Sequence, residues 1–230
     1  MAAPKIFVKC MFCSCMSGPF KALSEKELER VDRSRTEITY RKGEILCKQG
    51  SFISNTIFIK KGLVKIYLEG PDHPLIISLE KDGYFIGIPS LFGDGVFHYT
   101  VEAMTDVEVC QVDINVYRDL LRNNAEFASR ILEKANEDIV TAYNRMYSIT
   151  HKQIHGRFAE LLDYLSGRIY ESNPFELTLT RKDMAELIHS SPESVSRLIK
   201  EFKDDGIIES GTHSIEIKDG KRLQQISMFG

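Results

Sequence analysis

The pattern of apolar and polar positions changes character near Asp113. Before it, short β-branched and aromatic runs alternate with turn residues, starting at about Ile38. Many short strands at such regular spacing are typical of a barrel or roll. After Asp113, apolar residues recur every three or four positions, which predicts helices up to about Ile169. The pattern therefore predicts an α+β protein with a roll of strands first and helices after it.

A single long helix is predicted from about Ala125 to Thr150. Small or apolar residues recur along it at the alternating spacing of four and three that a heptad repeat produces. Such a seam is typical of a helix that pairs with a second copy, and the alternative is a helix packed only on its own roll. The seam consists of Ala135, Ile139, Ala142, Met146, Ile149 and Gln153.

Residues 178–210 predict two short helices separated by a tight turn. Thr180 can cap the first helix, and Asp183, three residues later, can complete a capping box. Ser191 is a good capping residue for the second helix, and Pro192 suits its first position. Two helices joined in this way fit a DNA major groove, although an ordinary helix pair in a core gives the same pattern.

The second of these helices has an apolar face and a polar face. Gly206 is expected to end it in a left-handed conformation. The alternating residues 214–218 that follow predict a small hairpin, or wing. The apolar face consists of Val195, Leu198, Ile199 and Phe202. The polar face consists of Glu193, Ser194, Ser196, Arg197, Lys200 and Lys203.

Three segments that end in glycine precede the helices: residues 44–50 (EILCKQG), 57–62 (IFIKKG) and 82–87 (DGYFIG). Together with the helix pair and the wing, they resemble the Crp/Fnr family of bacterial transcription regulators over residues 20–225. The resemblance implies a cyclic-nucleotide-binding-like β-roll that senses an effector or redox signal. It also implies a long dimerisation helix and a winged helix-turn-helix that binds DNA.

The resemblance further implies a division of the chain and a set of partners. We expect a cysteine-bearing segment over residues 1–19, the β-roll over 20–120, the dimerisation helix over 121–150 and the DNA-binding domain over 151–230. The expected partners are double-stranded DNA with a palindromic site, a second copy of the chain and RNA polymerase. The alternative function is an effector-binding module whose C-terminal helix pair docks a protein instead of DNA.

The second helix of the pair begins with the pattern E-x-x-S-R, formed by Glu193, Ser196 and Arg197. This pattern is similar to the Fnr branch of the family, in which the matching residues read base edges. Arginine suits guanine, and glutamate suits the amino group of cytosine. Pro192 stands where the Crp branch has an arginine, which favours Fnr-like sites. The expected DNA-binding residues are Arg181, Lys182, Glu193, Ser194, Ser196, Arg197 and Lys200.

Net charge does not by itself indicate DNA binding. The chain has 30 Lys and Arg against 33 Asp and Glu, which gives −3, and residues 151–230 have 11 against 13, which gives −2. Basic residues are instead placed locally, at the start of the first helix and along the second. Local positive charge and helix N-termini can hold phosphates, so we expect binding that depends strongly on salt.

The roll lacks the residues with which cyclic-AMP-binding members of the family hold their ligand. Those members use a Gly-Glu pair and, further on, an Arg-Ser pair, where this chain has Gly87-Ile88 and His98-Tyr99. Without the carboxylate for the ribose and the arginine for the phosphate, cyclic AMP is not expected to bind. The pocket holds a less anionic ligand or is filled by its own side chains. Its expected lining is Phe85, Gly87, Ile88, His98, Tyr99 and Tyr143.

Five cysteines are an odd count, and disulfides are not the default in a cytoplasmic protein. Oxygen-sensing members of the family bind an iron–sulfur cluster through three N-terminal cysteines and one from the strand in which Cys110 falls here. The N-terminal spacing, C-x2-C-x-C, is tighter than theirs, so a zinc site, a redox thiol pair and an unliganded tail stay open as alternatives. The candidate ligands are Cys10, Cys13, Cys15 and Cys110.

Other classes of protein lack support in the sequence. The chain contains no G-x-S-x-G, H-E-x-x-H or P-loop motif, so we do not expect an enzyme. No apolar run approaches the length of a membrane span, and the first residues lack the apolar core of a signal peptide. A cytoplasmic protein with no membrane partner is therefore expected.

Overall fold

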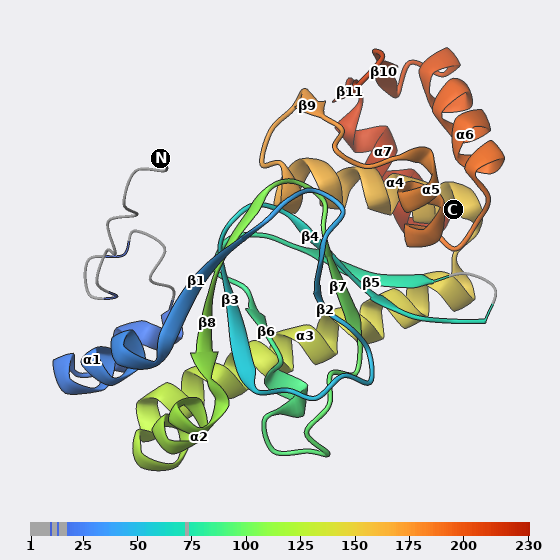
Figure 1. The fold of residues 1–230 in the computed structure, drawn as a ribbon. Coiled ribbons are helices and arrows are strands. Elements are labelled where there is room, and N and C mark those ends of the chain that lie inside the picture. The colour runs from blue at the N-terminus through green and yellow to red at the C-terminus, as the bar shows by residue number, and fades with distance from the viewer. Residues whose placement is uncertain (1–9, 11–12, 14–17, 72–73) are drawn as a thin grey trace. The chain divides into compact units, whose positions relative to one another are not determined.

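The computed structural model describes residues 10, 13, 18–71 and 74–230 (Figure 1). They form two compact units. The first comprises Met1–Val64 and Lys81–Ile139, and the second comprises Lys65–Glu80 and Val140–Gly230. Strands dominate the first unit and helices the second, so the predicted α+β class, with a roll, a long helix and a winged helix-turn-helix, is confirmed.

The first unit is built on antiparallel strands. One four-stranded sheet has the order β1-β8-β3-β6, and β2 pairs with β7 in another sheet. The predicted run of strands is confirmed, although its first strand begins three residues before Ile38. The bounds are β1 Arg35–Tyr40, β2 Ile45–Cys47, β3 Asn55–Lys61, β6 Phe85–Ile86, β7 Thr100–Ala103 and β8 Val107–Asp113.

Two helices of this unit begin at capping residues that can be recognised in the sequence. Ser24 and Glu27 form a capping box at the start of α1 (Glu25–Ser34). Asp113 ends β8 and caps α2 (Ile114–Asn123), because its carboxylate accepts a hydrogen bond from the amide of Asn115 at 2.7 Å. The change of period near Asp113 therefore marks a real boundary between strand and helix.

Aromatic side chains form the centre of the first unit. The ring of Phe85 lies 5.0 Å from that of Phe58, 5.1 Å from that of Phe20 and 5.7 Å from that of Tyr117. Tyr117 in turn makes an edge contact with Phe127 at 5.4 Å. Pairs at these separations add to the stability gained by burying the rings. Phe20 thereby ties the segment before α1 to the sheet and to α3.

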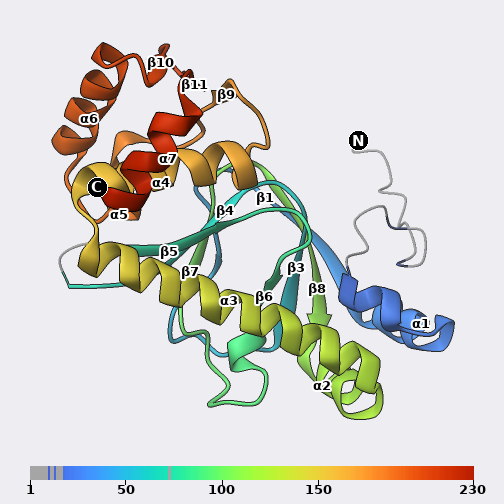
Figure 2. The ribbon, with the colours of Figure 1, turned by 180° about the vertical axis from the view of Figure 1, so that it is seen from behind.

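α3 runs from Ala125 to His151 as one unbroken helix (Figure 2), which confirms the predicted long helix. In the single chain, Ile139 and Met146 of the heptad seam are 48% and 62% exposed. The seam prediction was wrong at Gln153, because this residue has an extended backbone and stands at the N-cap position of the next helix, outside α3. The large apolar side chains that α3 exposes form an apolar stripe of Leu132, Ile139, Val140, Tyr143, Met146 and Tyr147.

The second unit contains the helix-turn-helix and the wing. Phe158, Leu161 and Leu162 of the helix that follows α3, and Leu165 of the turn after it, are buried. No helix in the described ranges combines the length and apolar character that crossing a membrane requires. The bounds are β4 Val64–Leu68, β5 Leu75–Glu80, α4 Ile154–Tyr164, a π-helical turn Leu165–Ile169, β9 Phe175–Glu176, α5 Arg181–Leu187, α6 Pro192–Asp204, β10 Ile208–Ser210, β11 Ser214–Ile217 and α7 Gly220–Phe229.

Removal of the hydroxyl group should have opposite effects on stability at two tyrosines, Tyr117 and Tyr164. The hydroxyl of Tyr117 is fully buried and has no hydrogen-bond partner in the described part of the chain, whereas that of Tyr164 donates to the Leu79 carbonyl at 2.8 Å and accepts from its amide. Tyr117→Phe should raise the free energy of unfolding by about 1 kcal/mol, and Tyr164→Phe should lower it by about 1–2 kcal/mol. Urea denaturation of both variants measures the two changes, and destabilisation by Tyr117→Phe would contradict this assignment.

Candidate nucleic-acid interface

The first helix of the helix-turn-helix is fixed at its N-terminus. The Thr180 side chain accepts from the Asp183 amide, and the Asp183 carboxylate accepts from the Thr180 amide at 2.9 Å, so the predicted capping box is confirmed. Lys65 of β4 also approaches this carboxylate, at 3.1 Å. Burial raises the pKa of Asp183, but the hydrogen bonds from Thr180 and the charge of Lys65 outweigh it and lower the pKa overall. The start of α5 thus holds a buried negative charge that the sequence did not reveal.

The turn between the two helices depends on one residue in an uncommon conformation. His189 has φ of 53°, in the left-handed region that histidine enters more readily than most residues. The Ser191 hydroxyl then accepts from the Ser194 amide at 3.2 Å and caps α6, whose first residue is Pro192. Both predicted features of the start of α6 are confirmed.

The inner face of α6 anchors this helix in the second unit. The rings of Phe202 and Phe158 on α4 meet edge to face at 5.1 Å. Gly206 ends α6 with φ of 70°, as expected for a C-terminal glycine. The inner face consists of Val195, Leu198, Ile199 and Phe202, which are all buried, as predicted.

The outer face of α6 is polar and open. The Arg197 side chain is 65% exposed, and its guanidinium lies 3.6 Å from the Glu201 carboxylate. Exposed pairs at this spacing contribute only about 0.3–0.5 kcal/mol to stability. Arg197 therefore loses little free energy when it leaves Glu201 and binds another acceptor. The hydrogen bond from the Ser191 side chain lowers the pKa of Glu193, which is exposed on this face.

The other predicted DNA-binding residues differ in exposure. Lys200 and Ser196 are exposed on α6, and Ser194 is half-buried beside the cap. On the first turn of α5, Lys182 is exposed and Arg181 is half-buried. The structure therefore places the expected residues on the outer side of α6 and at the start of α5.

The predicted wing is present, and both β9 and α6 contact it. β10 and β11 pair antiparallel, and β9 adds a third strand. Lys203 forms an ion pair with Glu209 of β10 at 2.7 Å, so this lysine of the polar face is engaged with the wing. The tip, residues 211–213, is exposed. The sequence pattern located the hairpin but did not reveal the third strand, which comes from before α5.

The residues expected to line the effector pocket of the roll differ in burial and in their partners. The hydroxyl of Tyr99 accepts a hydrogen bond from the Gly87 amide at 2.9 Å. Phe85, Phe97 and Tyr99 are buried, and Ile88 is half-buried. His98 is exposed and faces Asp94, and Tyr143 is exposed on α3 in the second unit. Of the proposed lining, the structure groups Phe85, Gly87 and Tyr99 in the interior of the roll.

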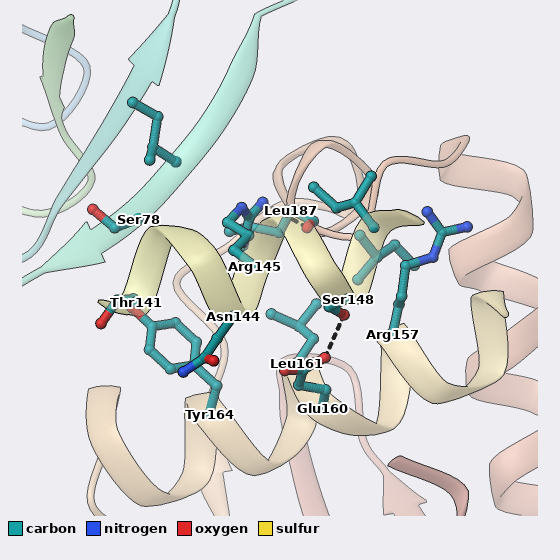
Figure 3. A pocket seen from close by; sticks show the side chains of 13 residues that line it. Ser78, Thr141, Asn144, Arg145, Ser148, Arg157, Glu160, Leu161, Tyr164 and Leu187 are labelled. Carbon is teal, nitrogen blue, oxygen red and sulfur yellow. Dashed lines mark hydrogen bonds between the residues drawn. The ribbon is translucent and has the colours of Figure 1, made fainter. Parts of the chain in front are cut away.

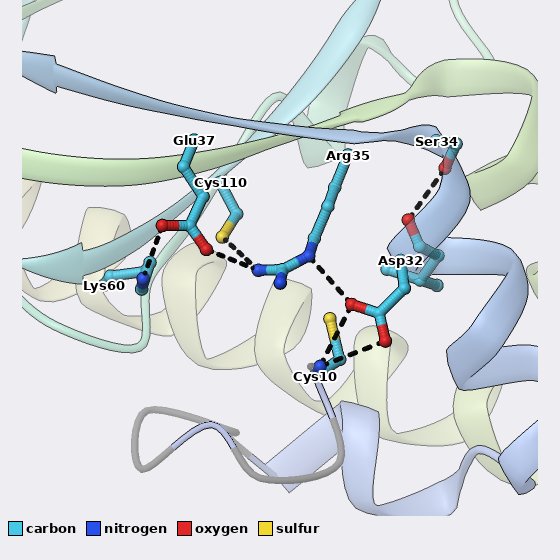
Figure 4. A network of polar contacts seen from close by, with 8 residues as sticks. Cys10, Asp32, Ser34, Arg35, Glu37, Lys60 and Cys110 are labelled. Carbon is cyan, nitrogen blue, oxygen red and sulfur yellow. Dashed lines mark hydrogen bonds and ion pairs between the residues drawn. The ribbon is translucent and has the colours of Figure 1, made fainter. Parts of the chain in front are cut away.

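The candidate cysteine site is organised around an arginine (Figure 4). Arg35 is 4% exposed and forms ion pairs with Asp32 at 2.8 Å and Glu37 at 2.7 Å. Its Nη1 also donates to the Cys110 sulfur at 3.5 Å, and the Cys10 amide donates to Asp32 at 3.0 Å. The Cys110 sulfur is thus hydrogen-bonded to a buried guanidinium that two carboxylates hold in place.

The described cysteines do not form a set of metal ligands. Within residues 10, 13, 18–71 and 74–230, no three His, Cys, Asp or Glu side chains converge as a metal site. Cys15 lies outside the described residues. Burial and a hydrogen bond with Asp32 raise the pKa of Cys10 to about 12, and burial raises the pKa of Cys110. As placed, Cys10, Cys13 and Cys110 do not converge on one metal position.

Two parts of the chain match models of protein families. Residues 37–124 match the cyclic nucleotide-binding domain, and residues 156–226 match the Crp-like helix-turn-helix domain. The two matches cover the strands of the first unit and the helix-turn-helix and wing of the second.

Curated proteins and solved structures resemble the whole chain. Electron transport regulator A of Shewanella oneidensis is 23% identical over 98% of this chain and 93% of its own length. The fumarate and nitrate reduction regulatory protein of Escherichia coli K12 is 23% identical over 96% and 90%. The structure of FixK2 from Bradyrhizobium japonicum superposes with a TM-score of 0.76 at 21% identity and covers 84% of this chain and 96% of that one. This likeness shows a shared fold.

The buried thiol of Cys47 gives a prediction about reactivity. Burial raises its pKa from about 9 to about 12, so at pH 8 its thiolate fraction should be about a thousandfold lower than that of an ordinary thiol. Alkylation by iodoacetamide, followed by mass spectrometry, should leave Cys47 unmodified in native protein and modify it in urea. Rapid labelling of Cys47 in the native protein at pH 8 would contradict the raised pKa.

Proposed function

The chain is a member of the Crp/Fnr family of transcription regulators, and on that premise we propose that it binds an inverted-repeat DNA site as a homodimer through the outer face of α6. Regulators of this family are not enzymes. The observation that supports the proposal most directly is the division of α6 into a buried apolar face and an open polar face. Direct readout of base edges needs a helix of this kind in the major groove.

Three side chains on α6 are assigned to base readout. Arg197 can donate two hydrogen bonds to guanine, Glu193 can accept one from cytosine, and the Ser196 hydroxyl can bond either partner. Lys200, Lys182 and the amides at the start of α6 suit phosphates, which orient the protein without reading sequence. Because these contacts are few and the unit is not basic overall, affinity should fall steeply with salt.

The alternative is that the helix pair docks a protein instead of DNA. A docking face of that kind needs aromatic or aliphatic anchors at its centre. The exposed positions of α6 carry serine, glutamate, arginine and lysine instead. A gel shift with promoter fragments in a series of salt concentrations separates the two functions, because a protein-docking module should give no salt-dependent shift.

The apolar stripe of α3 supports the homodimer. Six large apolar side chains exposed on one helix form the self-complementary surface that a two-fold dimer needs. A two-fold axis would relate the two copies of α6 and match them to the half-sites of a palindrome, about one helical turn apart.

The signal that the roll receives differs from cyclic AMP in this proposal. A cyclic phosphate requires an arginine and free amides, but the Gly87 amide is bonded to Tyr99 and no arginine stands at the matching position. We also propose that Cys110 binds no iron–sulfur cluster. Its sulfur accepts a hydrogen bond from Arg35, and Arg35 belongs to a buried network of ion pairs. RNA polymerase remains the partner that this family of regulators implies.

Substitution of Arg197 should change sequence readout. Arg197→Ala should cost about 1–3 kcal/mol per half-site and relax specificity at one base pair. Lys200→Ala should weaken binding to all sequences alike and lower the salt dependence by about one ion per half-site. Fluorescence anisotropy with specific and scrambled duplexes measures both, with the exposed Lys26→Ala in the first unit as the control. Unchanged specificity in Arg197→Ala would refute this assignment.

A charge placed in the apolar stripe should prevent dimerisation. In a two-fold interface, Met146→Asp places a carboxylate in an apolar contact on both copies, and desolvation of unpaired charge is costly. Analytical ultracentrifugation should show a dimer for the wild type and a monomer for this variant. Met228→Asp, the same change at an exposed methionine of α7, is the matched control and should stay dimeric. A dimeric Met146→Asp would mean that the stripe is not the interface.

Cyclic AMP should leave the protein unchanged. Because the Gly87 amide already has a partner, millimolar cyclic AMP should raise neither the melting temperature nor the affinity for DNA. Differential scanning fluorimetry measures the first effect and anisotropy the second. A saturable increase in melting temperature would show that the roll retains a cyclic nucleotide site.

A further inference from the structure

A cavity of about 170 Å³ lies within the second unit (Figure 3). It is lined by residues of β5, α3 and α4 and by the C-terminal end of α5, and no residue of α6 or the wing contributes to it. A protein cavity of about 150 Å³ is large enough to take up benzene. The space is therefore sufficient for a small organic ligand with a body the size of one aromatic ring.

The lining combines an apolar surface with two arginines. Arg145 comes from α3 and Arg157 from α4, and Figure 3 draws them on either side of the hydrogen bond between Ser148 and Glu160. A mainly apolar surface with a few convergent polar groups is typical of small-molecule sites. The apolar part consists of Ile77, Ile149, Leu161, Leu187 and Ile188.

The two arginines have hydrogen-bonding capacity that the protein does not use. The Nε of Arg157 is buried and has no partner among the described residues. Arg145 donates to the Leu187 carbonyl at 2.7 Å, and burial lowers its pKa. In the described part of the chain neither guanidinium lies within 4 Å of a carboxylate. A buried donor without an acceptor is uncommon in native proteins, and a group bound in the adjoining cavity would supply the acceptor that Arg157 lacks.

The one acidic residue of the lining is already neutralised. Glu160 accepts a hydrogen bond from the Ser148 hydroxyl and forms an ion pair with Lys152 at 3.2 Å. The Tyr164 hydroxyl is likewise engaged by the backbone of Leu79. The free donors of the cavity therefore belong mainly to the two guanidiniums, and its net charge favours an anion.

We propose that this cavity binds a compact amphiphilic anion, whose apolar body packs against Ile149 and Leu161 and whose carboxylate or phosphate group is held by Arg145 and Arg157. Arg145 and Arg157 are the two cationic residues of the lining, so a ligand with a single anionic group suits the site.

The position of Arg145 gives this site a regulatory consequence, which rests on the proposed function. Arg145 belongs to α3 and bonds the carbonyl of Leu187, the last residue of the first helix of the helix-turn-helix. An anion that engages Arg145 changes how the end of α5 is held on α3. Binding at this cavity is therefore coupled to affinity for DNA, and DNA changes the affinity for the anion by the same factor.

Isothermal titration of the full chain without DNA tests the site. The probes are phenyl phosphate and benzoate, which distinguish the two anionic groups, and phenol is the neutral control. At least one anion should bind at millimolar or lower concentration, and phenol should bind about tenfold more weakly or not at all. If neither anion binds, or if phenol binds equally well, the cavity holds only water or an uncharged ligand and the proposal fails.

Three variants assign the binding to this cavity. Arg157→Gln should weaken binding of the anion by about ten- to a hundredfold, since it removes a charged hydrogen bond. Ile149→Phe should fill the space and abolish binding while the melting temperature shows that the protein is folded. Arg222→Gln, at an exposed arginine of α7 that pairs with Asp205, is the matched control and should bind normally. Unchanged binding in both Arg157→Gln and Ile149→Phe would overturn the assignment.

Anisotropy with a labelled duplex, with and without phenyl phosphate, tests the coupling separately. The wild type should change its affinity for DNA when the anion is present, and Ile149→Phe should not respond. An anion that binds without changing DNA affinity would refute the coupling. Failure to bind DNA under any condition would refute the proposed function, while the titration would still decide whether the anion site exists.

Discussion

The burial of one face of α6 determines which side chains its opposite face presents to solvent. Phe202 makes an edge contact with Phe158 of α4, and Val195, Leu198 and Ile199 are removed from solvent beside it. Burial of such side chains contributes about 1.5–3 kcal/mol each, far more than any ion pair on the outer surface. The packing therefore fixes the rotation of α6, so that Glu193, Ser196, Arg197 and Lys200 face outward together.

α3 contributes two other features that bear on the helix-turn-helix. Its apolar stripe is exposed in the single chain, and its Arg145 donates to the carbonyl at the end of α5. A single helix thus carries both the apolar stripe and a contact with the helix-turn-helix. In a two-fold regulator, any ligand that alters the second of these contacts acts on both half-sites at once.

Local signals in the sequence predicted most of the fold. The caps at Thr180 and Ser191, the end of α6 at Gly206 and the boundary at Asp113 depend on neighbouring residues, so they can be recognised without the tertiary structure. The pairs formed by Lys65 with Asp183 and by Tyr99 with Gly87, and the contacts of Arg35 with Cys110, join residues distant in the chain. No local pattern encodes such contacts. The heptad seam was placed on the correct helix but wrongly included Gln153. The periodic sequence pattern continues past the end of α3, and only the backbone conformation shows where that helix ends.

Selection of binding sites from random duplex DNA by this chain measures whether α6 reads DNA as part of a two-fold dimer. If α6 reads the major groove in a two-fold dimer, the enriched sequences should be inverted repeats whose half-sites lie about one helical turn, roughly 10 base pairs, apart. Guanine and cytosine should be fixed at the positions that Arg197 and Glu193 read. Enrichment of unrelated or unpaired half-sites, or no enrichment at low salt, would contradict the account.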